Sequence, residues 1–456
     1  MNTFRKNPSS MMNPKLSRRS FIKASSALAG FQILPSGLLA NSPNGKLCTA
    51  HIGVAGKGHI DTSRIAADPR VEVMGLCDVD LRHLNSEGPR IRKDREILSF
   101  PSARKFQDYR EMLSALGDTI DAVSISTPDH THYPATLAAM QRGKHVFTQK
   151  PLTNNITEAR HLMKVAREKG LATQMGIQNK ATEGYRLATR LIREGVLGKV
   201  SKVYVWCHKD WGYDGDPYIG EDPVPDYLDW NLWLGTASKR SFLERKYHPS
   251  QWRRSMEFGC GTLGDMGVHI FDTPFDSLSL EPPVWVEATC REPNHFSLPT
   301  KSIVRYGFKP TPLTTKDFQW TWHDGAHSPP EGPDLELPEG QSLPQQGAMF
   351  VGEEGRMLLP HIAGPQLLPR SLYAKLKKPD MGPPVDHYGQ WIDAIFGSKT
   401  KPAANFDYSG KMVEGVLLGV VAGLYPEKRI KWDTAKGKVD NIPAANDFIK
   451  REYRAF

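Results

Sequence analysis

Acidic residues are absent from the first 45 positions of this 456-residue chain, although six lysine and arginine residues occur there. Without that segment the chain has 53 basic and 50 acidic residues, so its formal charge of +9 falls to about +3. This balance excludes the basic surface of a nucleic-acid-binding protein, and we expect no nucleic-acid partner. Long apolar runs are also absent, because residues 24–40 form a short stretch interrupted by Pro35 and Gly37. We therefore expect no stable membrane span.

Cysteine is scarce, with five residues at positions 48, 77, 207, 260 and 290. Their spacing fits neither a metal site nor a disulfide framework, so we expect no metal. Cys77 lies in a strand-like run and is expected to be a small buried hydrophobic residue. Hydrophobic residues make up 39% of the sequence, and the chain is long enough for two domains with full cores.

The N-terminal segment contains a motif typical of protein export. The run Ser17-Arg18-Arg19-Ser20-Phe21-Ile22-Lys23 matches the twin-arginine pattern at every position. We expect residues 1–45 to be a twin-arginine signal and linker, recognised by the twin-arginine export machinery, which places the protein in the periplasm or another extracytoplasmic space. Because this route carries folded proteins, it suits an enzyme that acquires its cofactor before export.

A glycine-rich turn follows the first expected strand, residues 48–55, and leads into an expected helix over residues 60–67. Glycine is needed there because the backbone turns tightly and approaches a pyrophosphate, which the helix N-terminus then attracts. Asp61 occupies the third glycine position of the dinucleotide-binding fingerprint, so the motif is incomplete. The residues of this turn that we expect to contact a dinucleotide are Gly53, Gly56, Gly58 and His59.

A second expected strand, Val71–Cys77, ends in Asp78. Asp78 follows Gly56 at about the distance, roughly 20 residues, at which dinucleotide folds place the acid that binds the ribose hydroxyls. A carboxylate there favours NAD, because it would repel the 2′-phosphate of NADP. Arg82 is close enough to accommodate that phosphate, so NADP stays open.

Strands and helices continue to alternate up to residue 175, with short loops between them. We expect further strands at 121–126, 144–149 and 171–175, a loop at Thr127–His132, and helices at 134–142 and 155–169. This order predicts a doubly wound parallel sheet, a Rossmann domain over residues 46–175. Ligands of such sheets bind outside the carboxyl ends of the strands, which is where the Thr127–His132 loop lies.

The stretch Gly264–Asp272 contains the residues best suited to proton transfer. As a helix, it would place Asp265, His269 and Asp272 on neighbouring turns of one face. A carboxylate beside an imidazole makes a proton-transfer site near neutral pH. The spacing alone fits a solvated helix face with a structural histidine at least as well.

Taken together, these motifs resemble those of the Gfo/Idh/MocA family, which includes glucose–fructose oxidoreductase and inositol dehydrogenase. The matching pieces cover nearly all of the chain after the signal and are Gly53–Gly58, 77–80, 127–130, 143–146, 149–151 and Gly264–Asp272. The segments 228–235 and 252–253 are similar to the exported, often saccharide-associated branch of the family. The resemblance implies a second, α+β domain over residues 176–456 with a large, mostly antiparallel sheet.

The resemblance also implies roles for individual residues. Lys150 would lie between nicotinamide and substrate and stabilise the charge on the reacting oxygen. His269 would take or return the hydroxyl proton, and Asp265 would orient the substrate or tune the histidine. Gln149 stands where the family usually has glutamate, which leaves Lys150 without an adjacent anion. The further residues that we expect to contact the cofactor are Thr127, Pro128, His130 and Gln149, and those expected on the substrate side are Asp272, Arg253, His248 and Trp233.

The second domain is less regular in sequence. Residues 200–206 alternate as a strand should, residues 208–229 are expected to be a loop, and 311–347 an irregular insertion. Helices are expected at 387–396 and 412–424. Aromatic residues are concentrated between Trp206 and Trp252; such faces bind sugars, but for any one of them a core position is favoured. An exposed sheet face and the resemblance predict a homo-oligomer, a dimer or tetramer.

We therefore predict an NAD(P)-dependent oxidoreductase that acts on a secondary hydroxyl or ketone of a sugar or glycoside. A cofactor outside the cytoplasm has no obvious regeneration partner, which suggests that NAD is tightly bound. One alternative is a glycosidase of the same fold that uses NAD for oxidation, elimination, hydration and reduction; such relatives tend to lack a lysine at position 150. Another is a non-catalytic sugar- or nucleotide-binding protein, which the joint presence of Lys150, Asp265 and His269 makes unfavourable.

Overall fold

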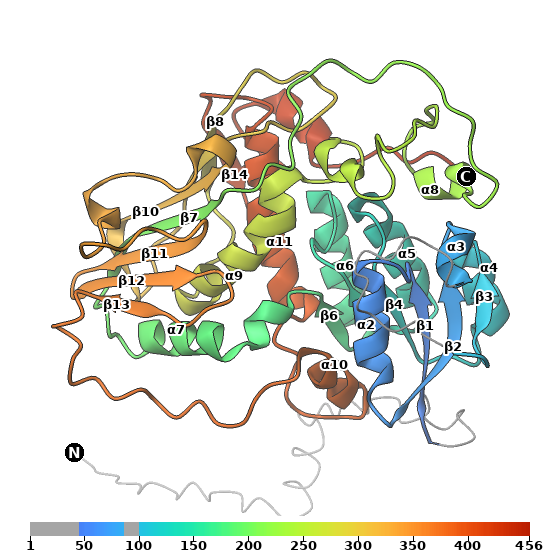
Figure 1. Cartoon of the computed structure of the whole chain (residues 1–456), viewed down its shortest axis with the longest axis horizontal. Helices are drawn as coiled ribbons and strands as arrows, with labels where there is room; N and C mark the ends of the chain where they lie inside the picture. Colours follow the sequence, from blue (N-terminus) through green and yellow to red (C-terminus); the bar gives the residue numbers. More distant parts are fainter. Residues whose placement is uncertain (1–44, 86–99) are drawn as a thin grey trace, which may run out of the picture.

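The computed structural model describes residues 45–85 and 100–456. Two domains lie side by side, and helix α11 (Phe406–Ala422) runs between them (Figure 1). The twin-arginine motif at 17–23 lies outside the described residues. Over the ranges that are described, no helix has both the length and the apolar character needed to cross a membrane.

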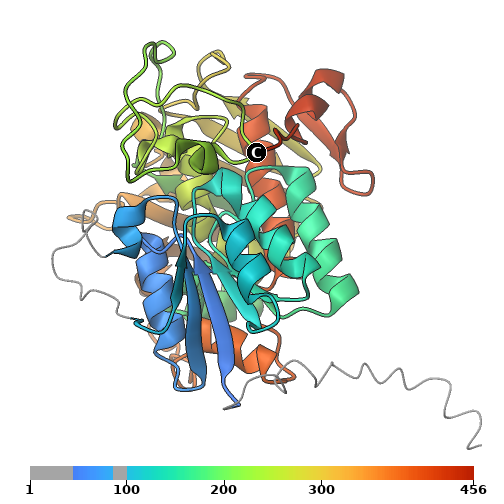
Figure 2. The same cartoon turned by 90° about the vertical axis from the view of Figure 1, so that its right-hand side faces the viewer.

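The first domain is a parallel six-stranded sheet in the order β3-β2-β1-β4-β5-β6, which confirms the predicted doubly wound fold. Helices flank this sheet (Figure 2). Its central strands are buried along their whole length because helices cover both faces. The strands are β1 (Leu47–Ile52), β2 (Val71–Cys77), β3 (Arg104–Phe106), β4 (Ala122–Ile125), β5 (His145–Thr148) and β6 (Thr173–Met175). The helices are α2 (Lys57–Ala66), α3 (Leu81–Leu84), α4 (Tyr109–Leu116), α5 (Asp129–Gln141) and α6 (Ile156–Lys169).

Sequence signals located some helix ends well and others poorly. Asn155 caps α6 by accepting a hydrogen bond from Thr157 N–H, and Gly170 ends the helix in the left-handed conformation, as expected. Helix α5 begins at Asp129, so the predicted loop Thr127–His132 is wrong for its last four residues. Pro134 suggested a helix start, but it lies inside the helix, more than one turn after the true beginning.

The second domain is built on a nine-stranded sheet in the order β13-β12-β11-β7-β10-β9-β8-β14-β15. Strands β7 and β10 pair in parallel and the other pairs are antiparallel, which confirms the predicted α+β domain. The strands are β7 (Val200–Cys207), β8 (Trp285–Thr289), β9 (Ile303–Gly307), β10 (Thr314–Asp324), β11 (Gln346–Gly352), β12 (Gly355–Pro360), β13 (Gln366–Leu368), β14 (Ile430–Asp433) and β15 (Lys438–Val439).

Strand β10 corrects the prediction that residues 311–347 are an irregular insertion. It is 11 residues long and pairs with both β7 and β9 in the middle of the sheet. Phe318, Trp320 and Trp322 alternate along it and are buried, so a period-2 signal was present in the sequence. The prolines and glycines on either side of this strand led to the prediction of an irregular segment. Within the range, the stretch without strands is 325–345, between β10 and β11.

The two faces of this sheet differ in what covers them. The inner side chains, such as Val203, Val205 and Phe350, belong to the main core. The helices of this domain are α7 (Glu183–Arg193), α8 (Trp230–Leu234), α9 (Val268–Ser277), α10 (His387–Ile395) and α11, of which α9 and α11 contact sheet strands. On the outer face, Trp206 forms a buried cluster with Leu335 from the irregular segment. That half of the face is therefore not exposed, which removes part of the support for a sheet-mediated oligomer; the dimer or tetramer itself stays a prediction.

Helix α10 lies within the range 176–456 predicted as the second domain, but it packs against the first. Tyr388 and Trp391 form a buried cluster with Phe147 of β5. Figure 1 shows α10 next to α2, at the lower left of the six-stranded sheet. The chain thus returns to the first domain after completing most of the second.

Candidate active site

The glycine-rich turn between β1 and α2 is as tight as the sequence predicted. Gly53 and Gly56 have φ values of 77° and 54°, in the left-handed region that favours glycine. A Cβ atom at Gly53 would lie 2.6 Å from the Ser126 carbonyl oxygen, and one at Gly58 would lie 1.9 Å from the Gly53 carbonyl oxygen. No side chain caps the N-terminus of α2, so its N–H groups can bind the phosphates of a dinucleotide.

Asp78 lies at the end of β2, opposite this turn. One carboxylate oxygen accepts a hydrogen bond from Val54 N–H at 3.0 Å, and the other accepts one from Asp80 N–H at 3.1 Å. His83 Nδ1 is 3.1 Å from the same carboxylate. Each carboxylate oxygen can accept a further hydrogen bond, so Asp78 can both brace the turn and bind ribose hydroxyls.

A cavity of about 330 Å³ runs from Asp78 past the glycine turn to Lys150. One wall comes from the first domain and the other from residues 232–253 of the second. Of the residues that we predicted at the site, the cavity is lined by Gly53, Gly56, Asp78, Thr127, Pro128, Gln149, Lys150, Trp233, His248 and Arg253. The structure therefore gathers most of the predicted cofactor residues around one dinucleotide-sized pocket.

Three predicted cofactor residues, Gly58, His59 and His130, do not line this cavity. Gly58 acts by packing, since it allows α2 to approach Gly53. His130 is buried, and its Nε2 atom lies 2.9 Å from the Trp233 carbonyl oxygen, so it joins the two walls. Burial lowers the pKa of His130 to about 3, which keeps the ring neutral.

The two departures from the family motifs meet in space. Asp61, in place of a glycine, is fully buried, and Gln149, in place of a glutamate, donates a hydrogen bond to it at 2.8 Å. Lys57, Ser126 and Tyr388 also donate to this carboxylate, at 2.6, 2.8 and 2.8 Å. A glutamate at position 149 would place two carboxylates in contact, so the amide at 149 suits the acid at 61.

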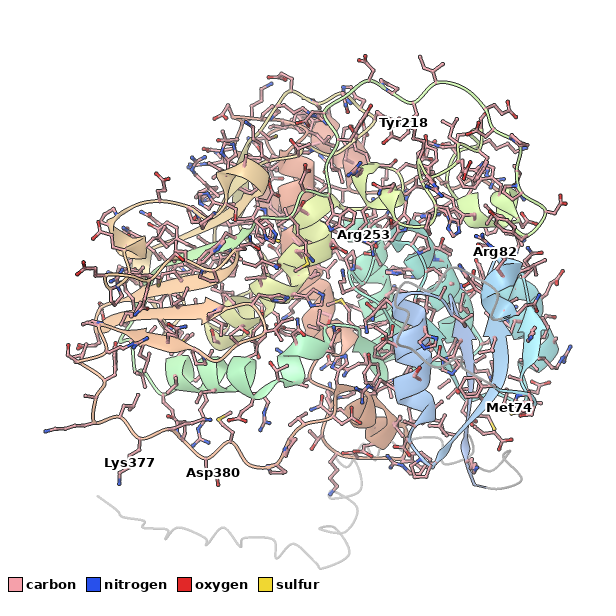
Figure 3. All side chains as sticks on the ribbon, viewed as in Figure 1. Met74, Arg82, Tyr218, Arg253, Lys377 and Asp380 are labelled. Atoms are coloured by element: carbon pink, nitrogen blue, oxygen red, sulfur yellow. The ribbon has the colours of Figure 1, made fainter. Side chains whose placement is uncertain are left out.

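Lys150 has an anionic partner after all, although it is not residue 149. Its Nζ atom donates to both the carboxylate and the backbone carbonyl of Asp265, each at 2.7 Å. Arg253 Nε donates to the same carboxylate at 2.9 Å, and Figure 3 shows Arg253 between the two domains. Burial opposes the charged form of Asp265, but the two cations outweigh it and hold its pKa well below the usual range.

The predicted pairing of Asp265 with His269 does not take the form of a hydrogen bond among the described residues. Leu263–Gly267 forms a π-helical turn that continues into α9, and Asp265 acts on His269 through its charge, which raises the histidine pKa against the larger lowering by burial. Asp265 contacts Lys150 and Arg253 instead. His269 is 7% exposed, and its Nδ1 atom has no hydrogen-bond partner among the described residues. Burial, and then the charge of Lys150, lowers the pKa of His269 well below its usual value, so the ring is neutral.

Asp272, predicted on the substrate side, is turned into the protein. It is 1% exposed and accepts hydrogen bonds from Tyr408 Oη at 2.6 Å and from Lys180 Nζ at 3.2 Å. These contacts link α9 to α11, which is a structural role for this carboxylate. Lys180 and Tyr408 could not be recognised as partners from the sequence, because 92 and 136 residues separate them from Asp272.

Trp233 and His248, also predicted on the substrate side, lie on the wall of the dinucleotide cavity. Trp233 is 3% exposed and stacks on Trp230 in a buried cluster, so it is mainly a core residue. His248 Nε2 is 3.2 Å from an oxygen of Asp80, beside the ribose-binding end. Both positions indicate that Trp233 and His248 lie beside the cofactor and not beside the substrate.

The structure adds three residues near the reacting end that the sequence analysis did not single out. Asp129 lines the cavity, and burial raises its pKa to about 7 in spite of nearby Arg253 and Lys150. The ring of His361 lies 6.1 Å from that of His269. The third residue is Lys209, next to the π-helical turn. Nothing in their local sequence marks His361 or Lys209, since they belong to a loop and a strand end.

The fold and this group of residues define a class of protein: a two-domain oxidoreductase that binds a nicotinamide dinucleotide. The more specific assignment comes from comparison. The chain belongs to the Gfo/Idh/MocA oxidoreductase family: a model of its NAD-binding Rossmann fold matches residues 50–177, and a model of its C-terminal alpha/beta domain matches residues 184–302.

Curated relatives match parts of the chain. A levoglucosan dehydrogenase from Pseudarthrobacter phenanthrenivorans is 24% identical over 182 residues, 38% of this chain and 38% of the relative. A scyllo-inositol 2-dehydrogenase (NADP(+)) from Bacillus subtilis is 24% identical over 227 residues, 50% of this chain and 51% of the relative. The chain thus spans about a third to a half of the length of these relatives.

Solved structures share the fold over most of the chain. The WlbA dehydrogenase from Bordetella pertussis, in complex with NADH and UDP-GlcNAcA, has a TM-score of 0.58 at 16% identity, covering 85% of this chain and 99% of that one. The aldose–aldose oxidoreductase from Caulobacter crescentus has a TM-score of 0.56 at 16% identity, covering 85% and 100%. At this identity the likeness establishes the architecture.

Proposed function

We propose that the protein oxidises a secondary hydroxyl of a sugar or glycoside, or reduces the corresponding ketone, by hydride transfer with NAD. The observation that carries this proposal is the group formed by Lys150, which lines the cavity, by its partner Asp265, and by His269, whose pKa the charge of Lys150 lowers. Lys150 comes from the first domain, and the other two come from the second. A substrate held between the domains would therefore meet both the cofactor and the proton-transfer groups.

His269 is the proposed base. Its neutral ring can accept the hydroxyl proton, and burial has already removed the water that would compete for its Nδ1 atom. Lys150, held by Asp265, donates a hydrogen bond to the oxygen that loses its proton and stabilises the negative charge there. Arg253 fixes the far side of Asp265, so the lysine is positioned before the substrate arrives.

Bound NAD supplies the hydride acceptor in this proposal. The glycine turn and the N-terminus of α2 would hold its pyrophosphate, Asp78 its ribose, and Thr127 and Pro128 the nicotinamide end. NAD is favoured over NADP because Arg82, the nearest candidate for a 2′-phosphate, is already paired with Asp80 at 2.6 Å and lies over the Tyr227 ring. Two carboxylates, Asp78 and Asp80, remain at this end of the pocket and disfavour the additional phosphate.

The sugar substrate rests on the relatives. Those named above include a levoglucosan dehydrogenase, an inositol dehydrogenase and an aldose–aldose oxidoreductase, which all act on polyhydroxylated rings according to their names. A 2,7-anhydro-N-acetylneuraminate hydratase is 29% identical over 151 residues, and its name describes no net oxidation. This relative supports the alternative, a glycosidase in which the cofactor undergoes no net change.

The test begins with the purified protein and the spectrum of any cofactor released by denaturation. A panel of sugars and aryl glycosides then follows, with cofactor absorbance and released aglycone recorded together. Cofactor reduction without bond cleavage supports the dehydrogenase. Aglycone release with no net cofactor change supports the NAD-dependent glycosidase, and failure to bind either NAD or NADP contradicts both.

Light scattering on the same sample measures whether the protein is the dimer or tetramer that we expect.

We also propose export by the twin-arginine route, on the strength of the sequence motif alone. Replacing Arg18 and Arg19 by lysine keeps the charge but removes the pair that the machinery recognises. The expected result is that the variant stays in the cytoplasm, folded and loaded with cofactor, whereas the wild type is found outside it. Equal distribution of the two would contradict the proposal. Tight binding of NAD predicts that the exported protein retains it through purification.

A further inference from the structure

Lys150 and Lys57 act on His269 through their charge, and two further cations, Arg253 and Lys209, contact the π-helical turn that precedes it; of these four described cations, all but Lys209 have a carboxylate partner. Lys150 and Arg253 share Asp265, and Lys57, the other cation whose charge reaches the histidine, is paired with Asp61 at 2.6 Å. The exception is Lys209. The acceptor found for its Nζ atom is the thioether sulfur of Met266 at 3.3 Å, and such a sulfur is a weak acceptor.

Lys209 is held in place by its backbone. It follows the end of β7, and its carbonyl oxygen accepts a hydrogen bond from Thr262 Oγ1 at 3.3 Å. The same hydroxyl accepts one from Trp211 N–H at 2.8 Å. Thr262 immediately precedes the π-helical turn that contains Asp265, so the ammonium group is fixed relative to the proposed catalytic residues.

The ammonium group of Lys209 also acts on His361 through its charge. Burial, and then the charges of Lys209 and Lys150, lower the pKa of His361 to about 4. The His361 ring in turn lies 6.1 Å from the His269 ring, and its Nδ1 is 2.8 Å from Tyr185 Oη. Lys209 and Lys150 therefore approach the two histidines from different elements.

No carboxylate in the described part of the chain forms an ion pair with Lys209. Asp265 already serves two cations, and Asp129, a second buried acid beside them, has a pKa of about 7 and is ionised only in part at neutral pH. A partly buried ammonium group with no carboxylate partner is available to a bound anion, with which it would form a charge-assisted hydrogen bond. The unpartnered Nδ1 atom of His269 shows that hydrogen-bonding capacity is also left for a ligand.

We propose that Lys209 binds an anionic group of the substrate, and that the substrate is therefore an acidic sugar, with a carboxylate on the ring, and not a neutral one. This inference rests on the proposed function, because it places the reacting hydroxyl at His269 and Lys150. Lys209 then acts as a specificity residue: it orients the acid group, which leaves the adjacent hydroxyl facing the proposed base.

The test compares matched pairs of hexoses and hexuronic acids in the gluco, galacto and manno series. In at least one series, kcat/KM for the acid is expected to exceed that for the neutral sugar by at least about tenfold, the effect of one charge-assisted hydrogen bond. Lys209→Gln should lower kcat/KM for the acid by roughly 10- to 100-fold and change that for the neutral sugar by less than about threefold. Lys209→Arg should retain most of the preference.

Lys164→Gln serves as the matched control, because Lys164 has a 70% exposed side chain on α6. It should leave both activities unchanged. An equal fall of both activities in Lys209→Gln would overturn the inference and assign Lys209 a structural role. Preference for the neutral sugar in all three series would also overturn it, while leaving the proposed oxidoreductase in place.

A binding measurement separates the inference from the proposed reaction. Glucuronate, galacturonate and mannuronate are added to the NAD-loaded protein at constant ionic strength, and the melting temperature is recorded. A rise with at least one acid that is lost in Lys209→Gln but kept in Lys164→Gln supports the anion site even if no sugar is turned over. No rise with any acid, in a protein that turns over neutral sugars, contradicts it.

Discussion

The nucleotide side and the substrate side of the site differ in how completely their polar groups are satisfied. On the nucleotide side, Asp61 accepts hydrogen bonds from four donors, and both oxygens of Asp78 accept backbone N–H groups. On the substrate side, within the described part of the chain, His269 Nδ1 has no partner and the acceptor found for Lys209 Nζ is a thioether sulfur. A wall built for an invariant cofactor can be complete before it binds, whereas groups that act on a substrate must stay available.

The largest effect should come from removing the base. His269→Ala is expected to lower kcat by about 10²–10⁴-fold, which is what a positioned proton-transfer group contributes. The affinity for NAD should change little, since His269 does not line the dinucleotide cavity. Stopped-flow hydride transfer and calorimetric NAD binding measure the two sides separately. His295→Ala, at an exposed position, is the control, and parallel loss of NAD binding in His269→Ala would mean that the histidine is structural.

The second prediction tests the hydrogen bond between Gln149 and Asp61 on the nucleotide side. Gln149→Glu replaces a donor to Asp61 by a second carboxylate and should lower the free energy of unfolding by on the order of 3 kcal/mol. The double variant Asp61→Gly/Gln149→Glu should recover part of this loss, because the new carboxylate can accept from Lys57 and Tyr388. Urea unfolding of all four proteins gives the coupling energy. Additive effects would show that the two residues do not compensate each other.

A substitution that disturbs the packing of the glycine turn should have a smaller effect on stability. Gly58→Ala places a methyl group against the Gly53 carbonyl, so the turn must open, at a cost of about 1–3 kcal/mol in stability. The affinity for NAD should fall with it, while the rate of hydride transfer at saturating NAD stays close to that of the wild type. Gly364→Ala is the control, because a Cβ atom there meets nothing within 4 Å. Loss of catalysis without loss of affinity would contradict this division.

The smallest expected effect is in the pH profile. The pKa of His269 is lowered, so its neutral form persists as the pH falls through the usual histidine range and is lost only at lower pH. The inflection of kcat/KM due to His269 should therefore lie well below pH 6.5. The Asp129 carboxyl, whose pKa is about 7, could also give an inflection near pH 7. The variant Asp129→Asn removes this carboxyl and so identifies its inflection. A histidine inflection at or above pH 6.5 in that variant would contradict a buried neutral base.

The regular parts of the fold were readable from the sequence because their signals are local. Strand β2 was predicted at its observed ends, and the caps of α6 follow from Asn155 and Gly170. The turn at Gly53–Gly58 was recognised because backbone conformation at close range demands glycine. By contrast, β10 was missed although its alternation was present, since the breakers around it outweighed a short period-2 pattern.

The proposed catalytic residues came from motifs, but their partners did not. The spacing of Asp265 and His269 suggested a pair, whereas the Asp265 carboxylate accepts a hydrogen bond from Lys150, 115 residues away in sequence. Gln149 and Asp61 each looked like a departure from the family pattern until the fold brought them together. Both contacts depend on how strands and helices pack, which no short window of sequence contains.

By itself, the sequence determined the class of fold, the dinucleotide turn and the residue types available for proton transfer, because periodicity and backbone requirements are written locally. Only the tertiary structure decided which of these side chains meet, which are neutral and which lack a partner. Charge state and hydrogen bonding depend on burial and on neighbours within a few ångströms, and in this chain those neighbours come from two domains. That is why the neutral state of the His269 ring, and the lack of a carboxylate partner for Lys209 among the described residues, could be seen only in the folded molecule.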